Sequence, residues 1–361
     1  MKIPFIDLQS QYQNYKSEID SSIQDVLDSS QYIMGPKVKS FESNLAKYVG
    51  VKHAIGCASG TDALLIALMA IGIKAGDEII TSPFTFIASS EVISLLGAIP
   101  VFVDVEADTY NIDASQIESK ITTKTKAIMP VSLYGQTADM DAINTIAEKH
   151  HLVVIEDAAQ SFGATYKGKK SCNLSHIACT SFFPSKPLGC YGDGGALFTD
   201  DDELAEKSRL YLAHGSKRRY DHEVVGINGR LDAIQAAILD VKLSYFDDEI
   251  RKRQDVANFY FDHLKDKNMS LPVIKPERTS VFAQFTIQTN KREHYIKRLN
   301  DKGVPTAIHY PKPLHLQTCF DYLNYKKGDF PISEKASEEV FSLPMSPFLT
   351  QEQQTIIVDL F

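Results

Sequence analysis

Patterns typical of strands and helices alternate along this chain, and this alternation restricts the fold more than any other feature. Short apolar runs at 78–81, 99–104, 127–131 and 151–155 are typical of strands, and the nearly all-apolar stretch 61–73 is typical of a buried helix. Alternation of this kind is characteristic of an α/β protein. We therefore predict an α/β fold with a mainly parallel central sheet.

A long helix is predicted to begin near Leu231, because apolar residues recur after it at helical spacing. Charged residues then become frequent from 247 to 254. We predict a large domain of residues 1–245, which includes an N-terminal arm, and a smaller C-terminal α/β domain of residues 246–361 with a strand at 281–287. The chain has 361 residues and is 43% hydrophobic, which is ample for two domains.

The composition limits where the protein works and what it binds. The formal net charge of −8 argues against nucleic acid and against an anionic membrane surface as partners. No apolar run reaches the roughly 18–20 residues of a membrane span, and the first residues lack the basic and apolar parts of a signal peptide. Five cysteines without regular spacing argue against a disulfide framework and a zinc site. We therefore expect a cytoplasmic protein without a metal site.

Lys186 lies in a loop that prolines and glycines restrict. Pro184 and Pro187 flank it, Gly189 follows, and the glycine-rich stretch 192–195 leads into a predicted strand. A lysine pKa near 10 is too high for a nucleophile at neutral pH unless burial and neighbouring positive charge lower it. The alternative is a surface lysine, which the restricted loop disfavours.

Asp157 ends the apolar run that precedes this loop. The carboxyl ends of strands in open α/β sheets border ligand-binding crevices. A lysine that forms a Schiff base and a carboxylate that keeps a ring nitrogen protonated are what a pyridoxal-phosphate enzyme needs. Gln160, one helical turn on, could reach the ring's phenolic oxygen, and Phe86 could stack on the ring. The alternatives are a helix cap at Asp157 and a core aromatic at Phe86.

A phosphate site is predicted where Gly60 and Thr61 open the apolar helix. Glycine lets the backbone approach an anion, and the free N–H groups and the helix dipole attract a phosphate. The hydroxyl of Ser181 could join the same phosphate. The alternative is an ordinary cap, with Ser59 or Thr61 capping and Asp62 complementing the dipole.

Asn228 and Arg230 precede the long helix. The arginine fork suits a carboxylate or phosphate. The alternative is that Asn228 caps the helix and Arg230 pairs with Asp232. Further basic or polar aromatic residues, each individually also compatible with a structural role, are Lys217, Arg218, Arg219, Tyr220, His222, His309 and Tyr310.

In this order, the motifs at 59–64, 156–161, 181–186 and 226–235 resemble the sugar-nucleotide aminotransferases of the DegT/DnrJ/EryC1/StrS family. The resemblance runs from 5–8 to 343–345 and implies a fold-type I pyridoxal-phosphate enzyme. The stretches 130–136, 172–175 and 187–191 look most like the branch that aminates C3 of a UDP-linked 2-acetamido-3-oxo hexuronic acid, with glutamate as donor, for O-antigen and lipopolysaccharide synthesis.

Carried over position by position, the resemblance implies that Lys186 holds the cofactor as a Schiff base and that Asp157 holds its ring nitrogen. Asn228 would reach the cofactor phosphate of the partner subunit, which implies a homodimer with shared sites. Arg230 is our candidate for a sugar carboxylate. The other implied cofactor contacts are Gly60, Thr61, Phe86, Gln160 and Ser181, and the weaker candidates for sugar contacts are His309 and Tyr310.

Three competing hypotheses remain. A dehydratase of the same family would carry histidine in place of Lys186. A non-catalytic cofactor-binding regulator would be expected to carry a DNA-binding domain and a basic surface. An aminotransferase for another 3-keto or 4-keto sugar nucleotide, UDP- or dTDP-linked, would share the cofactor residues. Pro187 replaces a polar residue of many relatives, which weakens carry-over at the sugar site.

Overall fold

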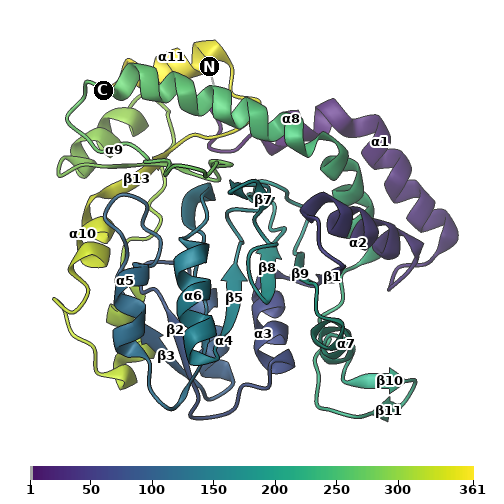
Figure 1. Cartoon of the computed structure of the whole chain (residues 1–361). Coiled ribbons are helices and arrows are strands. Elements are labelled where there is room, and N and C mark those ends of the chain that lie inside the picture. The colour runs from purple at the N-terminus through teal and green to yellow at the C-terminus, as the bar shows by residue number, and fades with distance from the viewer. Residues whose placement is uncertain (1–2) are drawn as a thin grey trace.

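A central sheet of mainly parallel strands organises the protein, as the sequence predicted. The computed structural model describes residues 3–361. Within them the sheet has seven strands in the order β1-β9-β8-β5-β4-β2-β3, and β9 runs antiparallel to both neighbours (Figure 1). The strands are β1 (His53–Cys57), β2 (Glu78–Thr81), β3 (Ile99–Phe102), β4 (Thr125–Ile128), β5 (Val153–Asp157), β8 (Ile177–Ser181) and β9 (Gly195–Thr199).

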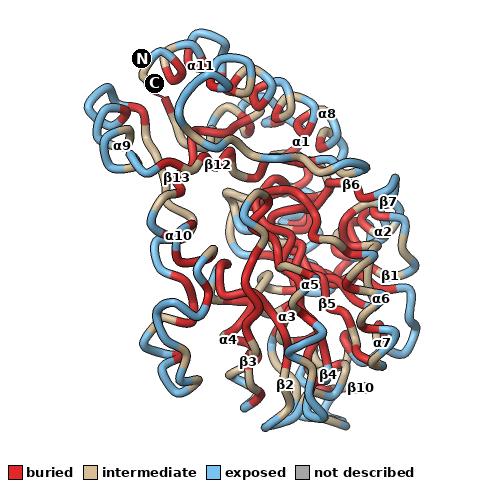
Figure 2. The backbone as a smooth tube through the Cα atoms, turned by 60° about the vertical axis from the view of Figure 1, so that its left-hand side comes forward, coloured by how far each residue is buried: buried red, intermediate tan, exposed pale blue. Residues whose placement is uncertain are grey.

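Helices cover both faces of the sheet, because successive strand residues point to opposite faces and both sets are apolar. One face packs on α3 (Gly60–Ala70), α4 (Ala88–Leu95) and α7 (Asp202–Tyr211). The other packs on α2 (Pro36–Val49) and α8 (Ala233–Leu264) at one end and on α5 (Ala114–Ile117) and α6 (Met140–His150) at the other. Figure 1 shows α5 and α6 in front of the sheet and α3 and α4 behind it, and Figure 2 shows the sheet itself as buried.

The long helix α8 begins two residues after the predicted start and continues to Leu264. It crosses the predicted domain boundary at 245/246 without interruption. Its later residues Val256, Tyr260 and Leu264 belong to a separate apolar core that also contains residues from 282 onward. This second core supports the two-domain division, which stays a prediction.

The second core is built on a small antiparallel sheet of β12 (Phe285–Gln288) and β13 (Val340–Leu343). The predicted strand at 281–287 is thus shorter and shifted, because residues 280–283 pack against the turn at Gly135 instead of pairing. Figure 1 shows α8 running above the sheet between this part and the N-terminal helices. The remaining α-helices and strands are α1 (Leu8–Ser29), α9 (Arg292–Asn300), α10 (Pro331–Glu339), α11 (Gln351–Val358), β6 (Thr165–Tyr166), β7 (Lys169–Lys170), β10 (Ser216–Arg218) and β11 (Asp221–His222).

Between residues 3 and 361, no helix combines the length and the apolar character needed to cross a membrane.

Candidate active site

A cavity of about 500 Å³ opens at the carboxyl edge of the parallel strands. Its walls come from the start of α3, the ends of β5 and β8, the segment 85–89, the lysine loop and the segment 309–310. The structure therefore brings together nine of the predicted site residues, which are Gly60, Thr61, Phe86, Asp157, Gln160, Ser181, Lys186, His309 and Tyr310.

The loop that carries Lys186 is fixed by its own backbone. The N–H of Lys186 donates to the carbonyl of Phe183 at 2.8 Å, and the N–H of Cys190 donates to Phe182 at 2.8 Å. Gly189 is required by close packing, because a Cβ there would lie 2.5 Å from the carbonyl oxygen of Pro184. The lysine is partly buried, and its ammonium forms no hydrogen bond or ion pair with residues 3–361. A free amine thus lines the cavity.

Asp157 is only 4% exposed and lies at the end of β5. Its carboxylate accepts hydrogen bonds from the hydroxyl of Ser89 at 2.7 Å and from the N–H of Ala159 at 3.2 Å. Burial raises the pKa of this carboxyl, while these two bonds and the nearby Lys186 ammonium act in the opposite direction. The bond to Ala159 is a turn contact, and the described chain forms a turn over 159–163 and no helix before β6, so the helix-cap alternative for Asp157 is wrong.

Burial lowers the pKa of the Lys186 ammonium, and the charge of Asp157 opposes this shift. The lowered pKa increases the fraction of neutral amine near pH 7. The neutral form is the one that can act as a nucleophile or accept a proton.

The start of α3 forms a cradle for an anion. Ser59 caps the helix by accepting from the N–H of Asp62 at 3.0 Å, while Gly60 and Thr61 lie in the first turn, where helical acceptors are lacking. A Cβ at Gly60 would lie 2.6 Å from the Cβ of Ser181, so glycine brings the helix start against the end of β8. The capping alternative is therefore correct for Ser59, and it leaves the anion site intact.

The wall opposite the lysine loop is aromatic and polar. Phe86 is 54% exposed, which is contrary to the core alternative, and its ring centroid lies 6.1 Å from that of Tyr310. Gln160 donates from Nε2 to the hydroxyl of Tyr310 at 3.1 Å. Burial, together with the Lys186 ammonium, lowers the pKa of His309 to about 4, so its imidazole is neutral at pH 7.

Asn228 and Arg230 lie outside this cavity. Asn228 is exposed, and its Oδ1 accepts from the guanidinium of Arg230 at 2.6 Å. The Nε of Arg230 is buried and has no partner among residues 3–361, where no ion pair joins Arg230 to Asp232 either. The arginine therefore keeps hydrogen-bonding capacity that the described chain does not use.

Several cavity residues escaped the sequence reasoning. Ser89 lies in the same segment as Phe86, for which only the aromatic ring was considered. Its spacing of one helical turn from Thr85 could have indicated that both hydroxyls face the same side. Gln284 had no signal, because it reaches the cavity from a loop far along the chain. Ser185, Phe183 and Asp193 also line the cavity.

These side chains fit pyridoxal phosphate. A free amine, a buried carboxylate and a glycine-lined helix start with a neighbouring hydroxyl match the aldehyde, ring nitrogen and phosphate of that cofactor. Lys186, Asp157 and the Gly60–Ser181 cradle would hold the three groups.

Comparisons with known proteins agree with this chemistry. Residues 13–361 match the family model described as the DegT/DnrJ/EryC1/StrS aminotransferase family. The UDP-2-acetamido-2-deoxy-3-oxo-D-glucuronate aminotransferase of Pseudomonas aeruginosa is 54% identical over 355 residues, 98% of each chain. The pleiotropic regulatory protein of Geobacillus stearothermophilus is 49% identical over 362 residues, 99% of this chain and 97% of that one.

Solved structures give the same result. DesV of S. venezuelae, in complex with a ketimine intermediate, superposes with a TM-score of 0.97 at 40% identity, covering 99% of this chain and 97% of that one. NtdA of Bacillus subtilis, with bound cofactor PMP, superposes with a TM-score of 0.93 at 32% identity, covering 99% of this chain and 84% of that one. The fold agrees with the expected fold-type I aminotransferase.

Proposed function

The chain belongs to the DegT/DnrJ/EryC1/StrS aminotransferase family, and we propose that it transfers an amino group from glutamate to the C3 keto group of a UDP-linked 2-acetamido-3-oxo hexuronic acid. The observation that carries the proposed chemistry is the free amine of Lys186 in one cavity with the buried carboxylate of Asp157. The UDP-linked uronic acid rests on the relative that is 54% identical.

The chain is an aminotransferase that uses pyridoxal phosphate. When bound, this cofactor supplies the electron sink through which an amino group moves between two carbons. In our proposal Lys186 holds the cofactor and carries protons on Nζ, for which its lowered pKa suits it. Asp157 offers a negative charge to the ring nitrogen, and Ser89 orients that carboxylate.

The remaining cavity residues position the reacting groups. Gly60, Thr61 and Ser181 would bind the phosphate at the helix start. Phe86 would cover one face of the ring, and Gln160 would donate to its phenolic oxygen. Aromatic cover of this kind excludes water from the reacting centre.

The anionic sugar nucleotide requires positive charge beyond that of the cavity. Among the described residues that line the cavity, Lys186 is the only lysine or arginine, whereas Asp157 and Asp193 carry carboxyl groups. We propose that Arg230 of a second subunit meets the sugar carboxylate and that Asn228 of that subunit reaches the cofactor phosphate. The homodimer is therefore part of the proposal, as is a cytoplasmic location, with which five free cysteines are compatible.

Product analysis tests the substrate. The purified holoenzyme would be offered glutamate with a panel of UDP- and dTDP-linked 3-keto and 4-keto sugars. We expect amination of the UDP-linked 3-oxo uronic acid and release of 2-oxoglutarate. Preferential amination of a dTDP-linked or 4-keto sugar would replace this substrate by the alternative keto sugar nucleotide.

A regulatory role is the alternative from a different class, and one relative bears a regulatory name. The visible spectrum separates the two hypotheses. An aminotransferase should lose its long-wavelength cofactor absorbance when glutamate is added and regain it when the keto sugar follows. A spectrum that glutamate leaves unchanged would favour the regulator.

A further inference from the structure

Tyr134 adopts a backbone conformation that is unusual for a bulky residue. Its φ is +58°, in the left-handed region, and it is followed by Gly135 at φ +120°. A Cβ at Gly135 would lie 2.6 Å from the backbone nitrogen of Phe282, and the N–H of Val281 donates to the carbonyl of Gly135 at 3.0 Å. Left-handed tyrosines persist where the surrounding structure imposes them, and such positions concentrate at functional sites.

The backbone of Tyr134 determines how Gln160 is oriented. Its N–H donates to Oε1 of Gln160 at 2.8 Å. Because an N–H can only donate, the amide oxygen must face Tyr134 and the amide nitrogen must face Tyr310, 3.1 Å away. One N–H of Gln160 then remains available to the cavity that this side chain lines.

The same geometry sets the direction of the hydroxyl of Tyr310. This hydroxyl accepts from Gln160, so its own hydrogen is available to donate. Tyr310 lines the cavity, and no acceptor for that hydrogen occurs among residues 3–361. An oxygen of a bound ligand would complete the chain of hydrogen bonds.

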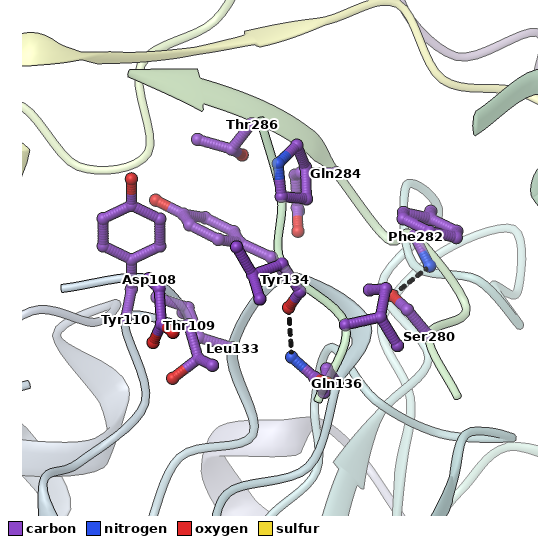
Figure 3. Close-up of a pocket in the computed structure, with 13 residues that line it drawn as sticks. Asp108, Thr109, Tyr110, Leu133, Tyr134, Gln136, Ser280, Phe282, Gln284 and Thr286 are labelled. Carbon is purple, nitrogen blue, oxygen red and sulfur yellow. Dashed lines mark hydrogen bonds between the residues drawn. The ribbon is translucent and has the colours of Figure 1, made fainter. Parts of the chain in front are cut away.

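The side chain of Tyr134 holds the segment that carries Tyr310. Its hydroxyl donates to the carbonyl oxygen of His309, and the Nδ1 of His309 lies 3.0 Å from the hydroxyl oxygen of Ser342. Figure 3 shows the Tyr134 ring beside that of Tyr110, and their centroids lie 5.6 Å apart in an edge-on arrangement. Packing on one side and the hydroxyl bond on the other place His309 and Tyr310 in the cavity wall.

We propose that Tyr134 is a positioning residue that aligns the two sides of the site at once. Its backbone N–H aims a donor of Gln160 at the cofactor, and its hydroxyl holds His309 and Tyr310 against the sugar. The sugar half of this inference rests on the proposed function. Tyr134 touches neither ligand and acts through these three residues.

The test exploits the fact that the two contacts come from different atoms. Tyr134→Phe removes the hydroxyl bond to His309 and keeps the backbone N–H on Gln160. The holoenzyme of this variant should bind UDP-glucuronic acid about five- to tenfold more weakly by calorimetry, the effect of one hydrogen bond. Its cofactor spectrum and its rate of glutamate-driven bleaching should stay within about twofold of wild type.

Two further variants make the result specific. Tyr110→Phe is the matched control, because its hydroxyl bonds to Gln288 at 2.8 Å, outside the cavity, and it should change neither measurement. Adding Tyr134→Phe to a variant that carries both His309→Ala and Tyr310→Phe should weaken binding little beyond that variant alone, since Tyr134 acts on the sugar through His309 and Tyr310. This cycle and the thermal unfolding temperature separate positioning from a general loss of stability.

The outcomes are distinct. If wild type does not bind UDP-glucuronic acid, the proposed substrate class fails and the sugar half of the inference fails with it. If wild type binds and Tyr134→Phe binds equally well, the inference is wrong while the proposed function stands. Equal slowing of glutamate bleaching and weakening of sugar binding would also overturn it, because that result indicates a merely structural tyrosine.

Discussion

The ammonium of Lys242 donates a hydrogen bond to the carbonyl oxygen of Gly189 across 2.7 Å. Lys242 lies on α8 and is 1% exposed, and Gly189 belongs to the loop that carries Lys186. Two turns earlier on the same side of the helix, Gln235 accepts from the N–H of Tyr191 at 2.9 Å and donates to its carbonyl at 3.2 Å. Helix α8 therefore fixes the lysine loop through the side chains of Lys242 and Gln235.

The burial of Lys242 predicts that the free energy of unfolding depends on pH. Burial lowers the pKa of Lys242 to about 8 from 10.5, although Glu249 opposes the shift. Between these two values the unfolded chain binds more protons than the folded chain, so the stability contribution of Lys242 rises with pH. Between pH 7 and 10.5, the free energy of unfolding of wild type should rise by up to about 3 kcal/mol relative to that of Lys242→Met.

Urea unfolding of both proteins across this range measures the difference, in which the titrations of other groups largely cancel. Lys124→Met, at an exposed position, is the control and should follow wild type at every pH. If the free energies of unfolding of wild type and Lys242→Met differ by the same amount at every pH, the prediction is wrong.

The second prediction concerns the cofactor bond. Borohydride reduction of the holoenzyme followed by peptide mapping should place the pyridoxyl group on Lys186, because its amine is free in the cavity. Lys186→Ala should lose at least about a hundredfold in turnover and still bind cofactor through the phosphate cradle. Lys124→Ala should be unaffected. Label on another lysine would disprove the assignment.

The third prediction concerns Ser89, which holds the carboxylate of Asp157 at 2.7 Å. Loss of a hydrogen bond to a charged group costs about 1.5–3 kcal/mol, so Ser89→Ala should weaken cofactor binding about ten- to a hundredfold. The neighbouring Ser90 is also buried, and its hydroxyl has no partner among the described residues. Ser90→Ala is thus a matched control. Equal effects in both variants would remove the positioning role of Ser89.

The fourth prediction tests the shared site. Asn228 lies outside the cavity of its own chain, and we propose that it serves the partner's cofactor. A heterodimer of Lys186→Ala and Asn228→Ala subunits would then contain one site with both native residues. Activity well above that of either parent dimer is expected after co-purification with two tags. Activity no higher than that of the parents would show that the sites are not shared.

The fifth prediction concerns substrate charge. Arg230 has a buried Nε without a partner in the described chain, which leaves its fork available for a carboxylate. Arg230→Ala should lose roughly ten- to a hundredfold more kcat/KM on the uronic acid than on its neutral 6-hydroxy analogue. Arg298→Ala, an exposed change on α9, is the control. Equal losses on both substrates would assign Arg230 a structural role.

The fold, and nine of the residues that line the candidate site, could be predicted from the sequence. The strand at 78–81 agrees with β2, and the apolar run from 151, predicted to end at Glu156 and Asp157, corresponds to β5, which begins at Val153 and ends at Asp157. The strand β8 ends at Ser181, because Phe182 leaves the sheet and its N–H donates to the carbonyl of Gly194 at 2.7 Å. Strand ends depend on such loop contacts, which a local pattern does not contain.

The sequence by itself determined the alternating strands and helices, the restricted loop around Lys186 and the acid at the end of its strand, because periodicity, proline and glycine act on near neighbours. The tertiary structure alone decided that Ser89 holds Asp157, that Tyr134 orients Gln160 and that Lys242 supports the lysine loop. The tertiary structure also places Asn228 and Arg230 outside the cavity that Lys186 and Asp157 of the same chain line. These relations join segments far apart in the chain, and only packing of the helices on the sheet brings them within hydrogen-bonding distance.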